Sequence, residues 1–186
     1  MLVAQAGLSQ FFEEAVQGSL QACRVEASTP AASYLVSLLE DFAKPDEAKE
    51  ETLGRPVSLL LDEALHNPKP AERFEKLRAI GDGVLYTAGF FGDHFERRGV
   101  DPKFVCMLGA RAYGSVSAML GVPTTLDVFG ELAAKFDAFV VVIGDVADQA
   151  TARSTAGLVR LYERWLRTRS DRLAEVLGMN RVKGVS

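Results

Sequence analysis

The fold of this chain depends on the stretch IGDGVLYTAGFFGDHF, residues 80–95, at the centre of a longer segment from Leu77 to Gly121. At about 100° per residue, nine positions fall within roughly a third of a helix circumference, so we expect them to face the core. They are Phe74, Leu77, Gly81, Val84, Leu85, Ala88, Phe91, Gly92 and Phe95. Gly81 and Gly92 would let another helix approach the backbone closely, although each glycine costs about 1 kcal/mol of helix propensity.

A second stripe of the same helix is polar, with Asp82, Tyr86, Gly89 and Asp93 at positions i, i+4, i+7 and i+11. Two carboxylates and a phenol that face the same way can form a surface for a ligand or a partner. The alternative is a solvated helix face that happens to carry a tyrosine, since exposed carboxylates are common and need no special explanation. The sequence leaves both interpretations open.

The motif Leu-x-x-Ile-Gly-Asp-x-x-Leu-Tyr-x-x-Gly-Phe-Phe runs from Leu77 to Phe91 and is followed by Arg-Ala-Tyr-Gly at residues 111–114. Over roughly residues 77–114 the chain therefore resembles an uncharacterised group of helical bacterial proteins. The resemblance implies a bacterial cytosolic protein. It carries no activity and no catalytic residue over to this sequence.

Composition is typical of a globular protein, and 186 residues suffice for one domain, 1–186, with a sizeable core. The net charge of −4 gives no general attraction to nucleic acid. The N-terminus lacks the basic region of a signal peptide, and the most apolar run, residues 138–144, is far shorter than the ~20 residues of a membrane helix. Cys23 and Cys106 are expected to be reduced thiols. We therefore expect a cytoplasmic protein with no membrane contact.

Hydrophobic periodicity and capping residues predict an all-α, single-domain bundle of six to eight helices. Residues 24–28 could be extended, and residues 44–54 form a charged surface connection with almost nothing to bury. Residues 139–143 are all apolar and could form a buried strand, but the flanking helical period favours a helix. The expected helices cover about residues 9–23, 29–42, 56–66, 70–98, 101–120, 125–147 and 151–177, with Ser9, Thr29, Asp101 and Thr125 as N-caps and with breaks allowed at 90–92 and at Ser170.

No known catalytic, cofactor or metal motif is complete. The Gly81-x-Gly83 pair lacks the third glycine and the preceding strand of a dinucleotide site. A Glu-x-x-His pair, Glu63 and His66, has the spacing found in di-iron bundles, but such sites need a second copy and two further glutamates. Cys106 cannot be paired with a histidine from the sequence and is best interpreted as a packing thiol. We expect no metal, no cofactor and no catalytic residue.

Arginines concentrate at the C-terminal end. Residues 151–186 hold eight basic and three acidic side chains, a net of +5, whereas the first 150 residues carry 13 basic and 22 acidic ones, a net of −9. Four of the arginines share one helical stripe, separate from the apolar face built by Leu158, Leu161, Tyr162 and Trp165. This basic stripe could bind phosphate or an acidic partner, or it could match the acidic remainder of the chain internally. It consists of Arg153, Arg160, Arg164 and Arg167.

The leading functional hypothesis is a non-enzymatic interaction or regulatory module, which binds a protein partner, a second copy or a small apolar ligand in a helical groove. The second hypothesis is a small-molecule binding protein or an enzyme. Its pocket would be formed by Asp82, Tyr86, Asp93, Arg111 and Tyr113. The third hypothesis is weak nucleic-acid binding through the basic stripe, which lacks interleaved aromatic residues and is therefore less well supported.

Two side chains test the predicted helix faces. Arg111 lies at the edge of the apolar stripe of its helix, so we expect it to be partly buried and to pair with Asp82 or Asp93, because an unpaired buried guanidinium costs several kcal/mol. Trp165 lies on the apolar face of the last long helix and is expected to pack against the core.

Overall fold

The computed structural model describes residues 2–43, 54–121, 127–152 and 155–178, and every regular element in these ranges is a helix. None of these helices is long and apolar enough to cross a membrane. The expected charged connection at 44–54 lies almost wholly outside the described residues. The helices are α1 (Leu2–Ala22), α2 (Thr29–Phe42), α4 (Val57–Leu65), α5 (Pro70–Phe90), α6 (His94–Arg97), α7 (Pro102–Leu120), α8 (Val128–Ala134), α9 (Phe136–Thr151), α10 (Thr155–Thr168) and α11 (Asp171–Val176).

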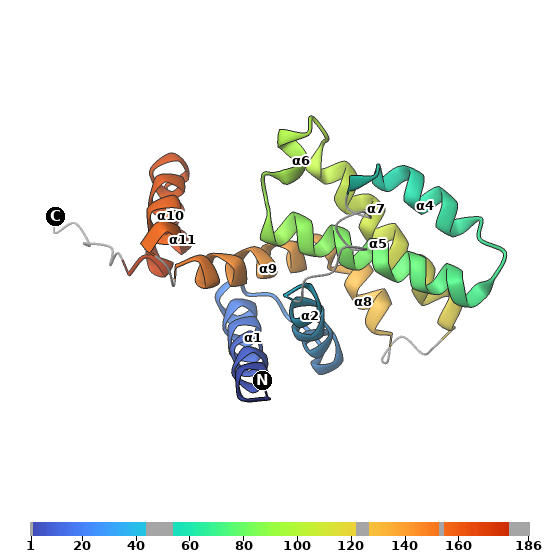
Figure 1. Cartoon of the computed structure of the whole chain (residues 1–186), viewed down its shortest axis with the longest axis horizontal. Helices are drawn as coiled ribbons and strands as arrows, with labels where there is room; N and C mark the ends of the chain where they lie inside the picture. The colour runs from blue at the N-terminus through green and yellow to red at the C-terminus, as the bar shows by residue number, and fades with distance from the viewer. Residues whose placement is uncertain (1, 44–53, 122–126, 153–154, 179–186) are drawn as a thin grey trace.

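Helix α9 runs through the middle of the molecule, and helices from both ends of the chain pack on it (Figure 1). Helix α5 packs along α9 and also against α7. Helix α1 packs on α9, and α2 lies beside α1 and also contacts α5 and α8. The C-terminal helices α10 and α11 pack on the far end of α9. This central place explains why the apolar run at 139–143 forms a helix, with Phe139, Val142 and Ile143 fully buried.

Local capping signals located both ends of α7 correctly. The carboxylate of Asp101 accepts a hydrogen bond from the Lys103 amide at 3.0 Å, so Asp101 caps α7 as expected. Helix α7 ends at Gly121, whose φ of 59° lies in the left-handed region that glycine adopts readily. Helix α2 begins at Thr29, but Ser28 and not Thr29 supplies its capping hydroxyl.

Other boundaries differ from the sequence prediction. Helix α1 begins at Leu2, so the expected start at Ser9 is wrong. Residues 24–28 form no strand among the described residues, and the expected N-cap Thr125 lies outside them.

The described ranges hold ten helices, more than the six to eight expected, because three of the expected long helices divide. Two breaks occur where they were allowed, between α5 and α6 and at Ser170 between α10 and α11. The third, at Lys135, separates α8 from α9. Helix α8 packs on α7 and α2, whereas α9 packs on α5 and α1, so one straight helix could not serve both sets of neighbours.

Glycines allow α5 to approach its neighbours closely, although only one of the two expected positions is correct. A Cβ atom on Gly81 would lie 2.5 Å from the ring of Tyr113, so this glycine does make room for another helix. Gly92 is exposed and has no such neighbour. Gly89, which the sequence placed on the polar stripe, is buried instead, and a Cβ atom there would lie 2.6 Å from the Cβ of Ile143. The contact between α5 and α9 therefore depends on Gly89.

We predict that Gly89→Ala destabilises the fold by about 1–3 kcal/mol, because the new methyl group would overlap the β-branched side chain of Ile143 on α9. Gly18→Ala is the matched control, since a Cβ there meets nothing within 4 Å and should add helix propensity worth about 0.5–1 kcal/mol. Urea unfolding of the two variants measures both effects. Equal effects of the same sign would contradict the close approach of α5 and α9.

Candidate functional site

Asp82, one of the two aspartates of the predicted polar stripe, is already hydrogen-bonded to other side chains of the fold. One carboxylate oxygen of Asp82, Oδ1, accepts hydrogen bonds from the hydroxyls of Tyr34 at 2.7 Å and Tyr113 at 2.6 Å. The guanidinium of Arg78, one turn earlier on α5, lies 3.7 Å from the other oxygen. These four side chains join α2, α5 and α7 and are called the tyrosine cluster.

Burial and charge act in opposite directions on the tyrosine cluster. Burial raises the pKa of Asp82, and the hydrogen bonds from Tyr113 and Tyr34 together with the charge of Arg78 oppose that rise. Burial and the neighbouring carboxylate both raise the pKa of Tyr113, which is fully buried, and of Tyr34. The phenols therefore stay protonated and act as hydrogen-bond donors to the carboxylate. This arrangement fastens three helices together and leaves little of Asp82 for a ligand.

The remaining residues of the predicted pocket lie elsewhere. Tyr86 stacks between Phe42 and Phe90, with ring centroids 4.3 and 5.0 Å away, and burial raises its pKa. Asp93 follows the end of α5, is exposed, and its carboxylate lies 4.0 Å from Arg97. Of the five predicted pocket residues, the structure brings only Asp82 and Tyr113 into contact.

The expected ion pair of Arg111 is wrong. Its side chain is exposed, and no ion pair joins it to Asp82 or Asp93, all three of which are described. Arg78 occupies the place beside Asp82 that was expected for Arg111. The spacing of Arg78 and Asp82, four residues apart on one helix, was the signal that could have identified this pair. Nothing in the sequence indicates that the hydroxyl of Tyr34 on α2 reaches α5.

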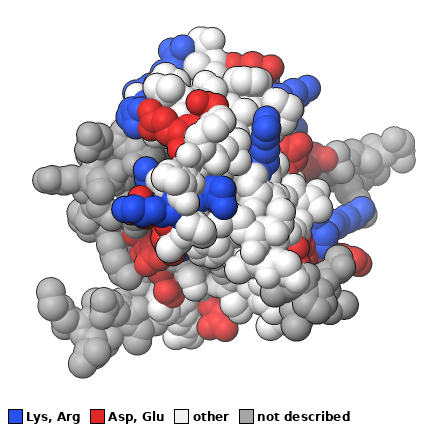
Figure 2. All heavy atoms as spheres, turned by 90° about the vertical axis from the view of Figure 1, so that its right-hand side faces the viewer, with Lys and Arg blue, Asp and Glu red and all other residues white. Residues whose placement is uncertain are grey.

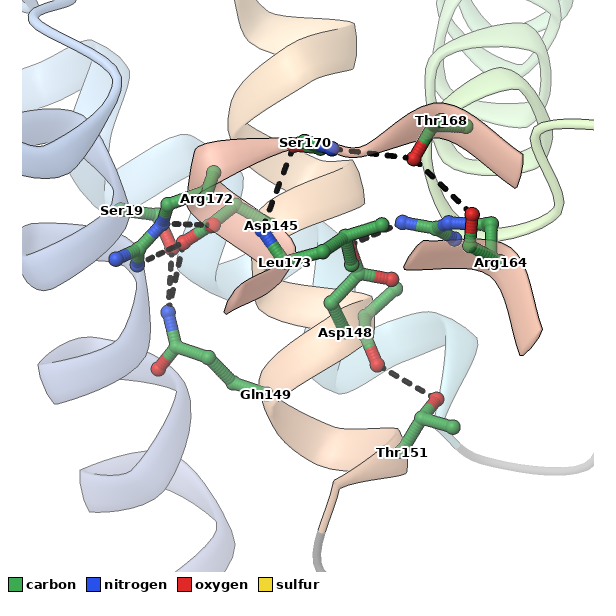
Figure 3. A network of polar contacts seen from close by, with 11 residues as sticks. Ser19, Asp145, Asp148, Gln149, Thr151, Arg164, Thr168, Ser170, Arg172 and Leu173 are labelled. Carbon is green, nitrogen blue, oxygen red and sulfur yellow. Dashed lines mark hydrogen bonds and ion pairs between the residues drawn. The ribbon is translucent and has the colours of Figure 1, made fainter. Parts of the chain in front are cut away.

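A second polar cluster holds the C-terminal helices on α9 (Figure 3). The carboxylate of Asp145, only 5 % exposed, accepts two hydrogen bonds from Arg172 of α11, at 2.5 and 2.8 Å. Ser19 of α1 and Gln149 donate to the same carboxylate at 2.7 and 2.8 Å. One turn along α9, Asp148, 9 % exposed, pairs with Arg164 of α10. We call α10 and α11 the C-terminal arm, and Asp145, Asp148, Arg164 and Arg172 the arm clasp.

The two acids of the arm clasp differ in their electrostatics. Burial alone would raise the pKa of Asp145, but hydrogen bonds from Arg172, Ser19 and Gln149 hold it below its ordinary value. Burial raises the pKa of Asp148 despite the opposing charge of Arg164. Asp145 is thus the acid whose ionised form the structure stabilises, and Arg172 is its main partner.

The arm clasp neutralises part of the predicted basic stripe by an ion pair. Arg164 pairs with Asp148, which is the internal match to the acidic remainder that the sequence left open. Arg167 is exposed. Arg153 and the side chain of Arg160 lie outside the described residues, so their role in a basic stripe stays a prediction. The described part of the stripe therefore offers one exposed arginine.

Helix α10 carries more apolar surface than α9 covers. At about 100° per residue its apolar side chains extend over nearly half of its circumference. Leu161, on one side of this arc, is buried. On the other side, Val159, Tyr162 and Leu166 are 54, 45 and 43 % exposed. These three residues are called the open stripe.

Trp165 lies at the edge of the open stripe. It is partly buried, with its ring 5.8 Å from that of Tyr162 and with the guanidinium of Arg169 4.7 Å above it. Its partners are thus on the arm itself, and it is not among the residues of the main core. The prediction that Trp165 packs against that core is therefore wrong.

Other candidate chemistry finds little support. No group of acids, histidines and cysteines that could hold a metal is present among the described residues, and the carboxylate of Glu63 pairs with Arg55 at 2.6 Å. Burial raises the pKa of Cys106 to about 11, so its thiol stays protonated near neutral pH. A hollow of about 360 Å³ lies between α4, α6 and α7 and is lined mainly by Val57, Phe95, Val100, Phe104, Val105 and Leu108.

The face of the molecule seen in Figure 2 carries acidic and basic side chains dispersed among uncharged ones, and neither sign forms a continuous patch there.

Comparison with protein-family models, curated proteins and solved structures finds no match to this chain. The resemblance to the uncharacterised bacterial group therefore stays a prediction.

We predict that Tyr34→Phe and Tyr113→Phe each destabilise the fold by about 1–2 kcal/mol, because each removes a hydrogen bond to a buried carboxylate. The double variant should lose more than the sum of the two, since Asp82 would keep only Arg78. Tyr86→Phe, on the same helix as Asp82, is the control and should change stability by less than about 0.5 kcal/mol. Urea unfolding provides the measurement, and strictly additive effects would argue against a shared acceptor.

For the arm clasp, we predict that Arg172→Gln destabilises the fold by about 2 kcal/mol at neutral pH. This is less than the 3–5 kcal/mol typical of a fully buried pair, because Arg172 is partly exposed and Asp145 keeps Ser19 and Gln149. Arg167→Gln, which changes an exposed arginine of the same arm, should have little effect.

The effect of Arg172→Gln should also depend on pH. Because the folded-state pKa of Asp145 is depressed, its ionised form stabilises the fold above the unfolded-state pKa of about 3.9, and this stability is lost as pH falls through the lower folded-state value. The difference between the wild-type chain and Arg172→Gln should therefore shrink below about pH 4. Urea unfolding across pH tests this, and a difference that does not change with pH would contradict the ion pair.

Proposed function

We propose that this chain is a protein-interaction module of the bacterial cytosol and that α10 is the helix that docks on its partner. The open stripe carries the proposal. Val159, Tyr162 and Leu166 leave about half of their surface in solvent on one side of a helix whose other side is docked on α9. An amphipathic helix with a free apolar side is a common recognition element.

The arm clasp supports this assignment because it fixes the direction in which the open stripe faces. Arg164 and Arg172 anchor α10 and α11 separately to α9, so the arm is oriented before any partner arrives. A preorganised surface loses less conformational entropy on binding than a mobile one. The same packing leads us to treat residues 1–186 as one domain, since α9 contacts helices from both ends of the chain.

The energetic scale points to a weak, reversible interaction. Burying the exposed halves of three large side chains contributes roughly 3 kcal/mol. Association costs on the order of 4 kcal/mol or more in lost freedom of motion, so additional polar contacts are needed. Reversible docking of this strength suits a regulatory module better than a permanent assembly.

The other two functional classes have less support. A small-molecule site near Tyr86 and Arg111 would need a free carboxylate, and Asp82 is engaged by two phenols and Arg78. Nucleic-acid binding would need the basic stripe, and Arg164 is paired with Asp148. Neither class has a described constellation that favours it over α10.

A photocrosslinking amino acid, p-benzoylphenylalanine, in place of Tyr162 tests the proposal in cells that express the chain. We expect a covalent adduct with a protein, because Tyr162 lies in the middle of the open stripe. The same amino acid in place of Leu59, an exposed apolar residue of α4, is the control and should give little or none of that adduct. Absence of any adduct specific to Tyr162 would overturn the proposed function.

A further inference from the structure

We propose that the partner of α10 is a second copy of this chain, with the two α10 helices packed antiparallel about a two-fold axis. This inference rests on the proposed function of α10 and adds the identity of the partner. A two-fold interface requires a self-complementary surface, in which residue i contacts residue j of the second copy and j contacts i. The described part of α10 has this property in both its apolar and its charged residues.

The apolar residues match when the axis passes close to position 164. Tyr162 and Leu166 are four residues apart, so they lie on the same side of α10, one turn apart. In the antiparallel arrangement Tyr162 faces Leu166 of the second copy, and Leu166 faces Tyr162 of the second copy. The same contact between Tyr162 and Leu166 therefore forms twice across the interface.

The charged residues match in nearly the same register, since a pairing of Glu163 with Arg167 places the axis one residue along the helix from position 164. Glu163 and Arg167 are exposed, lie one turn apart on the same flank of the open stripe, and form no ion pair with each other. Antiparallel packing about the two-fold axis brings the same flank of both helices together, with the order reversed. Glu163 therefore lies near Arg167 of the second copy, and the reverse pair forms as well. Opposite charges at such positions set the orientation and partner choice of paired helices.

No described helix outside the arm and α9 covers α10. Helix α10 stands at one end of the molecule, apart from α5, α6 and α7 (Figure 1). Its main neighbours are α9 and α11, and the ion pair of Arg164 with Asp148 places α9 on the side of α10 away from the open stripe. A second molecule can therefore place its own arm against α10 without displacing a described helix. The paired surface is small, which predicts concentration-dependent association and not a permanent dimer.

Sedimentation velocity of the purified full chain, over a range of about 5–500 µM, tests the inference. We expect a reversible shift from the mass of one chain toward twice that mass. Leu166→Glu should remove the shift, because it places a charge in the centre of the paired surface. Leu59→Glu, an equivalent change at an exposed apolar residue of α4, should leave the shift unchanged.

Charge reversal identifies the antiparallel register. Glu163→Arg alone and Arg167→Glu alone should each abolish association, because each brings like charges together in both pairs. A mixture of the two variants should associate again, since every pair then joins opposite charges. Circular dichroism and thermal melting of each variant confirm that these exposed changes leave the fold intact.

Three outcomes would overturn the inference: a chain that stays monomeric up to the highest concentration, association that survives Leu166→Glu, or a mixture of charge variants that fails to associate. The proposed function is judged separately, by the photocrosslink. An adduct at Tyr162 whose mass differs from that of two chains, together with a monomeric purified protein, would keep α10 as a docking helix and assign it a different protein partner.

Discussion

Two carboxylates on a nearly buried helix determine where the C-terminal end of this protein lies. Asp145 and Asp148 are one turn apart on α9, in the part of that helix that other helices cover. A buried carboxylate is costly unless a charged partner and further hydrogen bonds accompany it. Arg172 and Arg164 supply those partners from two different helices, and Ser19 supplies a bond from the first helix of the chain. The arm must therefore lie against α9 beside α1.

The tyrosine cluster uses the same physics at the other side of the core. Asp82 is held by two phenols from α2 and α7 and by an arginine of its own helix. In both clusters a carboxylate that could have been a ligand-binding group instead joins three helices. Polar residues inside a bundle restrict helices to one register, because any shift would leave a buried charge without its partners.

Helix ends, which depend on neighbouring residues, could be predicted from the sequence. The buried faces and ion-pair partners, which depend on distant residues, could not. Proline, aspartate and glycine at its two ends defined α7 almost to the residue. Gly89 was assigned to a polar face, because only the position of Ile143 on α9 shows that this side of α5 is buried. Arg164 was assigned to a basic surface for a related reason, since its partner Asp148 precedes it by 16 residues and belongs to another helix. Helical periodicity places residues on a face but does not say which face a neighbour covers.

The same distinction separates the centre of the chain, where the polar groups are paired inside the fold, from its C-terminal end. Asp82 and Tyr113, which suggested a site, are hydrogen-bonded to each other, and the side chain of Arg111 is exposed to solvent. The open stripe of α10 has the opposite character, with apolar side chains in solvent on a helix that ion pairs already hold in place. The solvent-exposed halves of Tyr162 and Leu166 add nothing to the stability of the fold, which is the physical reason to assign them to a partner.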